Sequence, residues 1–168
     1  MTVLLVCLLL VFPNLADSQS AQENWVVSFI LDGTETPTGK FVNITAIDLD
    51  SEGNLFILDS GRNRILKYSN QNLLLREIGG FGNSQDRFND PRDLDAHLTL
   101  NVFVSDYNNN RIVRFDSHLN YLSDFSIENL NISYDDPFYF EMPLSVAVNN
   151  QYDLFVLEDL NKRIVKFD

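Results

Sequence analysis

Short hydrophobic runs bounded by Gly, Asn or Asp recur along the chain in three similar groups. The second run of each group, such as Leu55–Leu58, is apolar at consecutive positions. A strand with one solvated face alternates apolar and polar residues, so consecutive apolar positions indicate a strand that is buried on both faces. The runs are short and rich in Val, Ile and Phe, which favours strands over helices. The pattern therefore predicts an all-β fold of sheets packed against one another.

The three groups align on Arg64, Arg111 and Arg163, which lie 47 and 52 positions apart. That spacing is in the range of a repeat of about 40 to 50 residues. Each aligned unit predicts three strands, and the units span residues 44–68, 91–115 and 143–167.

Fourth strands are predicted after the first two units, at residues 73–78 and 121–127. A similar segment, "WVVSFI" at residues 25–30, predicts a further strand of this kind before the first unit. Four antiparallel strands in a repeat of this length describe a blade of a β-propeller. The sequence therefore predicts a partial propeller of about three four-stranded blades in residues 19–168.

The repeated residues resemble a known family. Two units begin with Pro-x-x-Leu or Pro-x-x-Val, each second strand contains Phe, and the hairpin that follows reads Asp-x-x-x-Asn-Arg-Ile-x-x-Phe in its most regular copy. This pattern resembles the NHL repeat, the building block of six-bladed propellers. Residues 76–94 are similar to a blade junction of exported bacterial members. The third unit departs from the pattern, with Glu158 in place of the Asp and Lys162 in place of the Asn.

The resemblance implies half of a six-bladed ring, which further blades in a longer chain or a second copy of this chain would close. We interpret the chain as an exported, non-enzymatic binding module whose loop rim contacts a protein, a peptide or a glycan. One alternative is part of a propeller enzyme, since six-bladed relatives include amidating lyases and lactonases that hold a metal in the central channel. The other is a truncated fragment without independent function.

In each unit an acidic residue precedes the arginine, with four residues between them. If those four residues form the hairpin loop, the two charges face each other across the strands, where such a pair contributes roughly 0.2 to 1 kcal/mol. Asn, Asp and Gly in the loop, such as Asn108–Asn110, tolerate the left-handed backbone of a tight turn. A catalytic constellation stands in one place, whereas this pattern recurs. It therefore predicts structural turn clamps at Asp59–Arg64, Asp106–Arg111 and Glu158–Arg163.

Loops on one face of a propeller usually carry its binding function. The connectors from a fourth strand to the next first strand, and the loops between second and third strands, share such a face. The candidate binding residues on this rim are aromatic and charged: Phe81, Arg87, Arg92, Tyr107, Tyr134, Asp135, Asp136, Phe138 and Tyr139. An alternative for residues 138–140 is that they seal the gap between two blades.

The sequence predicts no catalytic residue, no metal ligand and no cofactor. The run Asp48–Asp59 matches part of a calcium-loop spacing, but it has no flanking helices, and we interpret it as a turn between strands. The histidines His97 and His118 are interpreted as surface residues at a strand end and in a connector. The inner strands carry three acids of interest: Asp48, Asp93 and Asp95.

Charge and the N-terminus restrict the location and the partners. The chain has 24 acidic and 12 basic residues and a formal net charge of −12, which disfavours nucleic-acid binding. Residues 1–18 have the order of a secretory signal peptide, an apolar run and then small residues. The run of about ten residues is shorter than the roughly 20 that a membrane span needs. We therefore expect a secreted or periplasmic protein, and, because Cys7 lies in the leader, one without disulfides.

Overall fold

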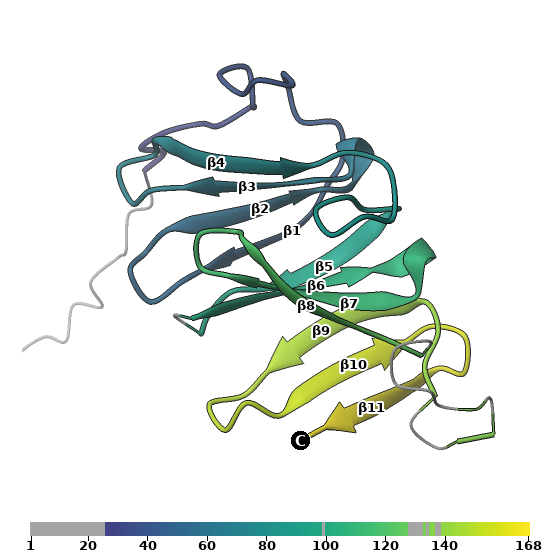
Figure 1. The fold of residues 1–168 in the computed structure, drawn as a ribbon. Helices are drawn as coiled ribbons and strands as arrows, with labels where there is room; N and C mark the ends of the chain where they lie inside the picture. Colours follow the sequence, from purple (N-terminus) through teal and green to yellow (C-terminus); the bar gives the residue numbers. More distant parts are fainter. Residues whose placement is uncertain (1–25, 99, 128–132, 134, 137–138) are drawn as a thin grey trace, which may run out of the picture. The chain divides into compact units, whose positions relative to one another are not determined.

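Three antiparallel β-sheets follow one another along the chain in the computed structural model, which describes residues 26–98, 100–127, 133, 135, 136 and 139–168 (Figure 1). The first sheet contains, in this order, β1 (Ile44–Leu49), β2 (Leu55–Asp59), β3 (Arg64–Tyr68) and β4 (Leu74–Gly79). The second contains β5 (Pro91–Asp95), β6 (Asn101–Asp106), β7 (Arg111–Asp116) and β8 (Tyr121–Ser126). The third contains β9 (Pro143–Val148), β10 (Leu154–Glu158) and β11 (Arg163–Phe167).

Each sheet is a meander in which consecutive strands pair. A short 3-10 helix fills the hairpin between the second and third strands of the first two sheets: η1 (Ser60–Arg62) and η2 (Tyr107–Asn109). The all-β prediction is confirmed, and the first strands begin at Ile44, Pro91 and Pro143, where the three repeat units begin.

Among the described residues, 26–30 lie outside the compact unit Leu31–Asp168. Val26–Ile30 form no strand, so the prediction of a strand at residues 25–30 is wrong for the part that the structure describes. Its pattern is that of a strand, but a strand forms only where another strand completes its hydrogen-bond ladder. Trp25 and the predicted leader, residues 1–18, lie outside the described residues.

A hydrophobic core joins each sheet to the next. Phe56 and Leu58 of β2 and Ile65 of β3 share one core with Phe88 of the connector before β5 and Phe115 of β7, and all five are fully buried. A second core, between the second and third sheets, includes the buried residues Phe103, Ile112, Phe140, Val146 and Val156.

The burial of the second strands, β6 and β10, differs between the second and third sheets. Every residue of β6 is buried, because the second sheet has a neighbour on both faces. In β10, by contrast, Leu157 is 38% exposed and Phe155 is half-buried, while Leu154, Val156 and Glu158 are buried. The prediction of strands buried on both faces therefore holds for β6 and for Phe56–Asp59 of β2, where Leu31 and Phe41 pack on the other side of the sheet, but not for β10.

Among the residues that the structure describes, no helix is long and apolar enough to cross a membrane.

Candidate functional site

The hairpin of each sheet contains one clamp pair. The strand register sets Asp59 opposite Arg64, Asp106 opposite Arg111 and Glu158 opposite Arg163. The arginine Nε lies 3.0, 2.8 and 2.9 Å from its carboxylate oxygen in the first, second and third pair. All three acids are fully buried, and the arginine side chains are 2%, 9% and 36% exposed. The first two pairs are therefore buried ion pairs, a different case from the exposed cross-strand pair that the sequence spacing describes.

Each clamp also holds the connector that leads into its own sheet. Arg111 Nη2 donates to the carbonyl oxygens of Ser84 and Arg87 at 2.9 and 2.8 Å. On the other side of the pair, the Asp106 carboxylate accepts the Asn89 backbone N–H at 2.8 Å. The other two arginines donate to connector carbonyls in the same way, at Gly39 and Tyr139.

The asparagine before each of the first two arginines joins one sheet to the next. Asn63 and Asn110 have positive φ angles of 52° and 50°, the left-handed region that Asn tolerates. Their side-chain oxygens accept the backbone N–H groups of Asp90 and Met142, at 2.8 and 2.9 Å, just before the next first strand. Lys162 has the same φ, 52°, in the third hairpin. The asparagines are therefore part of the architecture of the repeat.

The acids on the inner strands also bridge neighbouring sheets. Asp48 Oδ2 of β1 accepts the Ala96 N–H at 2.7 Å, and Asp95 Oδ2 of β5 accepts the Val148 N–H at 2.9 Å. Asp93 accepts a backbone N–H of β9 in the same way, from Val146. Each acid thereby orders the inner strand that follows it.

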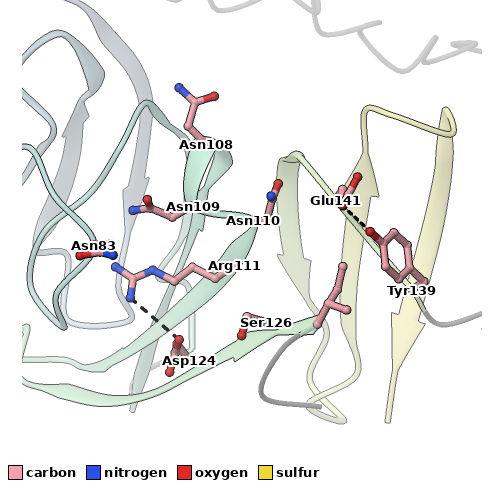
Figure 2. A pocket seen from close by; sticks show the side chains of 10 residues that line it. Asn83, Asn108, Asn109, Asn110, Arg111, Asp124, Ser126, Tyr139 and Glu141 are labelled. Carbon is pink, nitrogen blue, oxygen red and sulfur yellow. Dashed lines mark hydrogen bonds and ion pairs between the residues drawn. The ribbon is translucent and has the colours of Figure 1, made fainter. Parts of the chain in front are cut away.

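A cavity of about 510 Å³ lies beside the second hairpin (Figure 2). Its lining combines both connectors, the hairpin and the ends of β7 and β8: Asn83, Asn108, Asn109, Asn110, Arg111, Asp124, Ser126, Ile127, Tyr139 and Glu141. Most of these side chains carry polar atoms, and amides alone supply four of the ten residues.

Two interacting pairs of side chains, Arg111 with Asp124 and Tyr139 with Glu141, lie on opposite sides of the cavity in Figure 2. On one side, Arg111 Nη1 lies 3.9 Å from Asp124 Oδ2, and the Tyr121 hydroxyl donates to Asp124 Oδ1 at 2.8 Å. Burial and this hydrogen bond raise the pKa of Tyr121. On the other side, the Tyr139 hydroxyl donates to Glu141. With one guanidinium and two carboxylates, the lining carries a net negative charge and offers both donors and acceptors.

One of the nine predicted rim residues, Tyr139, lines this cavity. Tyr134 and Phe138 lie outside the described residues. Phe81 is 75% exposed, Arg87 and Asp135 are exposed and Asp136 is half-buried, and none of these four lines the cavity.

The remaining two predicted rim residues connect two hairpins. The Arg92 guanidinium lies 4.9 Å from the centroid of the Tyr107 ring, and the Tyr107 hydroxyl donates to Asp159 Oδ2 at 2.8 Å. This hydrogen bond raises the pKa of Tyr107. Phe140 is fully buried between the second and third sheets, as the alternative interpretation of residues 138–140 expects.

Sequence reasoning missed five residues of the cavity and gave Arg111 a structural role only. The five are two connector residues and three at the end of β8: Asn83, Glu141, Asp124, Ser126 and Ile127. Their position in the repeat could have indicated them, because the end of the fourth strand and the connectors before and after the sheet meet the hairpin of the same blade.

Meander sheets of about four strands, packed face to face and joined through their first strands, define blades of a β-propeller. The described chain is therefore part of a β-propeller.

Solved structures agree with this class at low sequence identity. Virginiamycin B lyase from Staphylococcus aureus matches with a TM-score of 0.52 at 14% identity, over 80% of this chain and 43% of that one. A putative exported protein from Bacteroides fragilis matches with a TM-score of 0.54 at 14% identity, over 76% and 35%. The extracellular domain of a putative one component system from B. thetaiotaomicron matches with a TM-score of 0.53 at 18% identity, over 74% and 17%.

This chain therefore spans less than half the length of these structures, and the likeness concerns the fold alone. No protein-family model matches the sequence. No curated protein sequence matches it either.

Proposed function

We propose that the chain is part of an exported, NHL-type binding module whose rim cavity takes a neutral, hydroxyl-rich ligand, a glycan of one or two sugar units. The observation that carries this proposal is the composition of the cavity of about 510 Å³, which is lined by four asparagines, two carboxylates and one arginine. Each asparagine amide both donates and accepts hydrogen bonds. A sugar hydroxyl also does both, so amides and carboxylates are matched partners for vicinal hydroxyl groups.

Three polar residues of the cavity, Arg111, Asn109 and Asn110, are held in place before any ligand binds. Arg111 is held by Asp106 and by two carbonyl oxygens, and Asn109 donates to Asp106 Oδ2 at 2.7 Å. Asn110 is held through its bond from Met142. Groups that are already ordered cost less conformational entropy when a ligand binds. This preorganisation supports a binding role for the same loops that build the blade.

An array of mono-, di- and trisaccharides probed with the full chain tests the proposal. We expect binding of a neutral saccharide, and isothermal titration with that saccharide then measures the affinity of variants. Asn83→Ala and Glu141→Gln each remove one hydrogen bond or one charge from the cavity, so each should weaken binding by roughly tenfold, the effect of about 1.4 kcal/mol. Asn150→Ala, in the turn between β9 and β10, is a matched control that should bind as the wild type does.

Two outcomes would overturn the proposal. If the chain binds a peptide and none of the saccharides, and Asn83→Ala weakens that binding, the cavity is the binding site but its ligand is not a glycan. If Asn83→Ala and Glu141→Gln leave the affinity for the saccharide unchanged, the cavity is not the binding site.

We also propose that the ring is closed by further blades, either from a second copy or from a longer chain. Apolar side chains on the outer faces of the first and third sheets support this idea: Ile47 is 65% exposed, Leu49 54% and Ile164 68%. Light scattering on a sizing column separates the two routes. A folded dimer favours the second copy, whereas a folded monomer rejects it.

A further inference from the structure

A second group of ligand-type side chains lies at the other end of the inner strands. It comprises Asp48 of β1, Asp95 of β5 and His97 just after β5, with one possible ligand atom from each within 4.8 Å of the others. Asp48 and Asp95 stand near the turns between first and second strands, whereas the cavity of Figure 2 lies at the hairpins between second and third strands. In an antiparallel meander these two kinds of turn lie at opposite ends of the sheet. The group is therefore distinct from the rim cavity.

The geometry of this group is fixed by the neighbouring backbone. The Oδ2 of each carboxylate accepts a backbone N–H, from Ala96 for Asp48 and from Val148 for Asp95, and Asp48 Oδ1 accepts the N–H of Leu49 at 2.8 Å. Asp95 Oδ1 lies 2.7 Å from His97 Nδ1. A carboxylate offers about four acceptor positions, so these bonds orient the two acids and leave lone pairs for another partner. Outer hydrogen bonds of this kind are what metal ligands in proteins use to hold their orientation.

The burial of the three side chains suits an ion that enters from solvent. The Asp95 side chain is 12% exposed and that of His97 is 41% exposed. The imidazole can therefore turn from Asp95 toward an ion bound by the two carboxylates, since one ligand atom of each residue lies within 4.8 Å of the others.

We propose that Asp48, Asp95 and His97 bind a divalent transition-metal ion of the zinc or manganese class and so connect the inner strands of the first two sheets. Imidazole with two carboxylates suits these ions, whereas Ca²⁺ and Mg²⁺ prefer oxygen ligands throughout. Three protein ligands leave at least one coordination position for water or a ligand.

The group occurs once in the described chain, unlike the repeated clamps. The position of Asp48 and Asp95 is taken by Ala147 in the third unit, and the position of His97 by Asp50 in the first. Asp50 is used differently, because it accepts from Asn54 and pairs with Lys67 at 3.3 Å. A constellation found at one place in a repeat protein is the pattern expected of a site rather than of the architecture. The sequence analysis grouped Asp48 and Asp95 as inner-strand acids, 47 positions apart, but interpreted His97 as a surface residue and did not join it to them.

Titration of the metal-free full chain with Co²⁺, followed by visible absorption, tests this proposal. We expect a saturable d–d signal at one ion per chain, displaced by Zn²⁺ but not by Ca²⁺. His97→Asn should weaken Co²⁺ binding by at least about tenfold, since even outer-shell changes have effects of that size. His118→Asn is the matched control, because His118 is also exposed but is not a member of the group.

A thermal melt of the same three proteins provides the second readout. At the same Zn²⁺ concentration the melting temperature should rise for the wild type and for His118→Asn and rise less for His97→Asn, because an ion that binds only the folded state stabilises it more when its affinity is higher. Circular dichroism of His97→Asn without metal shows whether the variant is folded. The proposal fails if no saturable binding occurs, if His97→Asn binds Co²⁺ as the wild type does, or if His118→Asn loses as much affinity as His97→Asn.

Discussion

Replacing Arg111 by methionine should destabilise the fold far more than the same change at Arg163. Arg111 Nε bonds Asp106 at 2.8 Å, and its side chain is 9% exposed beside a fully buried carboxylate. Removal of one partner from a buried ion pair costs about 3 to 5 kcal/mol, because the other charge stays buried. Glu158 is fully buried as well, but Arg163 is 36% exposed, so water can reach the carboxylate once the guanidinium is removed, and we expect a smaller loss of about 1 to 2 kcal/mol.

Urea unfolding followed by circular dichroism measures both changes in the free energy of unfolding. Domains of this size are stable by roughly 5 to 15 kcal/mol, so Arg111→Met should remove a large share and still leave a measurable folded state. The exchange Asp106→Asn in the Arg111→Met background should restore part of the loss, because it removes the buried charge that has lost its partner.

The pH dependence gives a second test of the same reasoning. Burial raises the pKa of Asp106 in the wild type, against the hydrogen bonds from Asn89, Asn109 and Arg111 that lower it. Without Arg111 the pKa rises further, so folding takes up a proton and the variant gains stability as the pH falls through the pKa of the folded state. The gap between the wild type and Arg111→Met should therefore narrow below neutral pH. Equal losses at Arg111 and Arg163, or a gap that does not change with pH, would refute this account of the clamps.

Three further predictions concern the turns and one buried acid. In urea titrations, Asn110→Ala should lower the free energy of unfolding by about 1 to 2 kcal/mol more than Asn110→Gly does. Both variants lose the same hydrogen-bond acceptor, but only alanine is strained at a φ of 50°. Gly79→Ala should prevent or strongly weaken folding, since its Cβ would lie 2.3 Å from a backbone oxygen, whereas Gly39→Ala has no atom within 4 Å and should cost about 1 kcal/mol. Equal effects of the two glycine changes would contradict the steric argument. Desolvation works against the ionised form of Asp50, but hydrogen bonds from Asn54 and Lys67 outweigh it and lower the pKa of Asp50. The urea midpoint of the wild type should therefore fall as the pH drops below about 4, and the midpoint of Asp50→Asn should fall less steeply. If both proteins show the same dependence on pH, the Asp50 carboxylate is not the group responsible.

The sequence was sufficient for the blades because their signals are local and repeated. Consecutive apolar residues in β2 and β6 predicted burial on both faces, and the spacing of Asp106 and Arg111 predicted that they face each other across the hairpin. Local patterns cannot show which distant segments of the chain cover an ion pair such as Asp106 and Arg111. The connector carbonyls that Arg111 binds are 24 and 27 positions away, and they turn a surface pair into a buried one. The segment at residues 25–30 has the pattern of a strand, but pairing decides whether a strand forms.

The two candidate sites were hard to predict because they arise where the units differ. The rim cavity depends on Glu141 and Asn83, which lie in connectors of unequal length outside the aligned units. The Asp48, Asp95 and His97 group depends on one unit having a histidine where another has an aspartate. Repetition identifies residues that build every blade, since each blade has the same backbone to satisfy. A ligand or an ion needs an asymmetric set of groups. Functional residues in a repeat protein are therefore best sought at positions where the backbone repeats but one unit has a different side chain. The cobalt titration of His97→Asn against His118→Asn tests that rule, because the two histidines differ in position and not in chemistry.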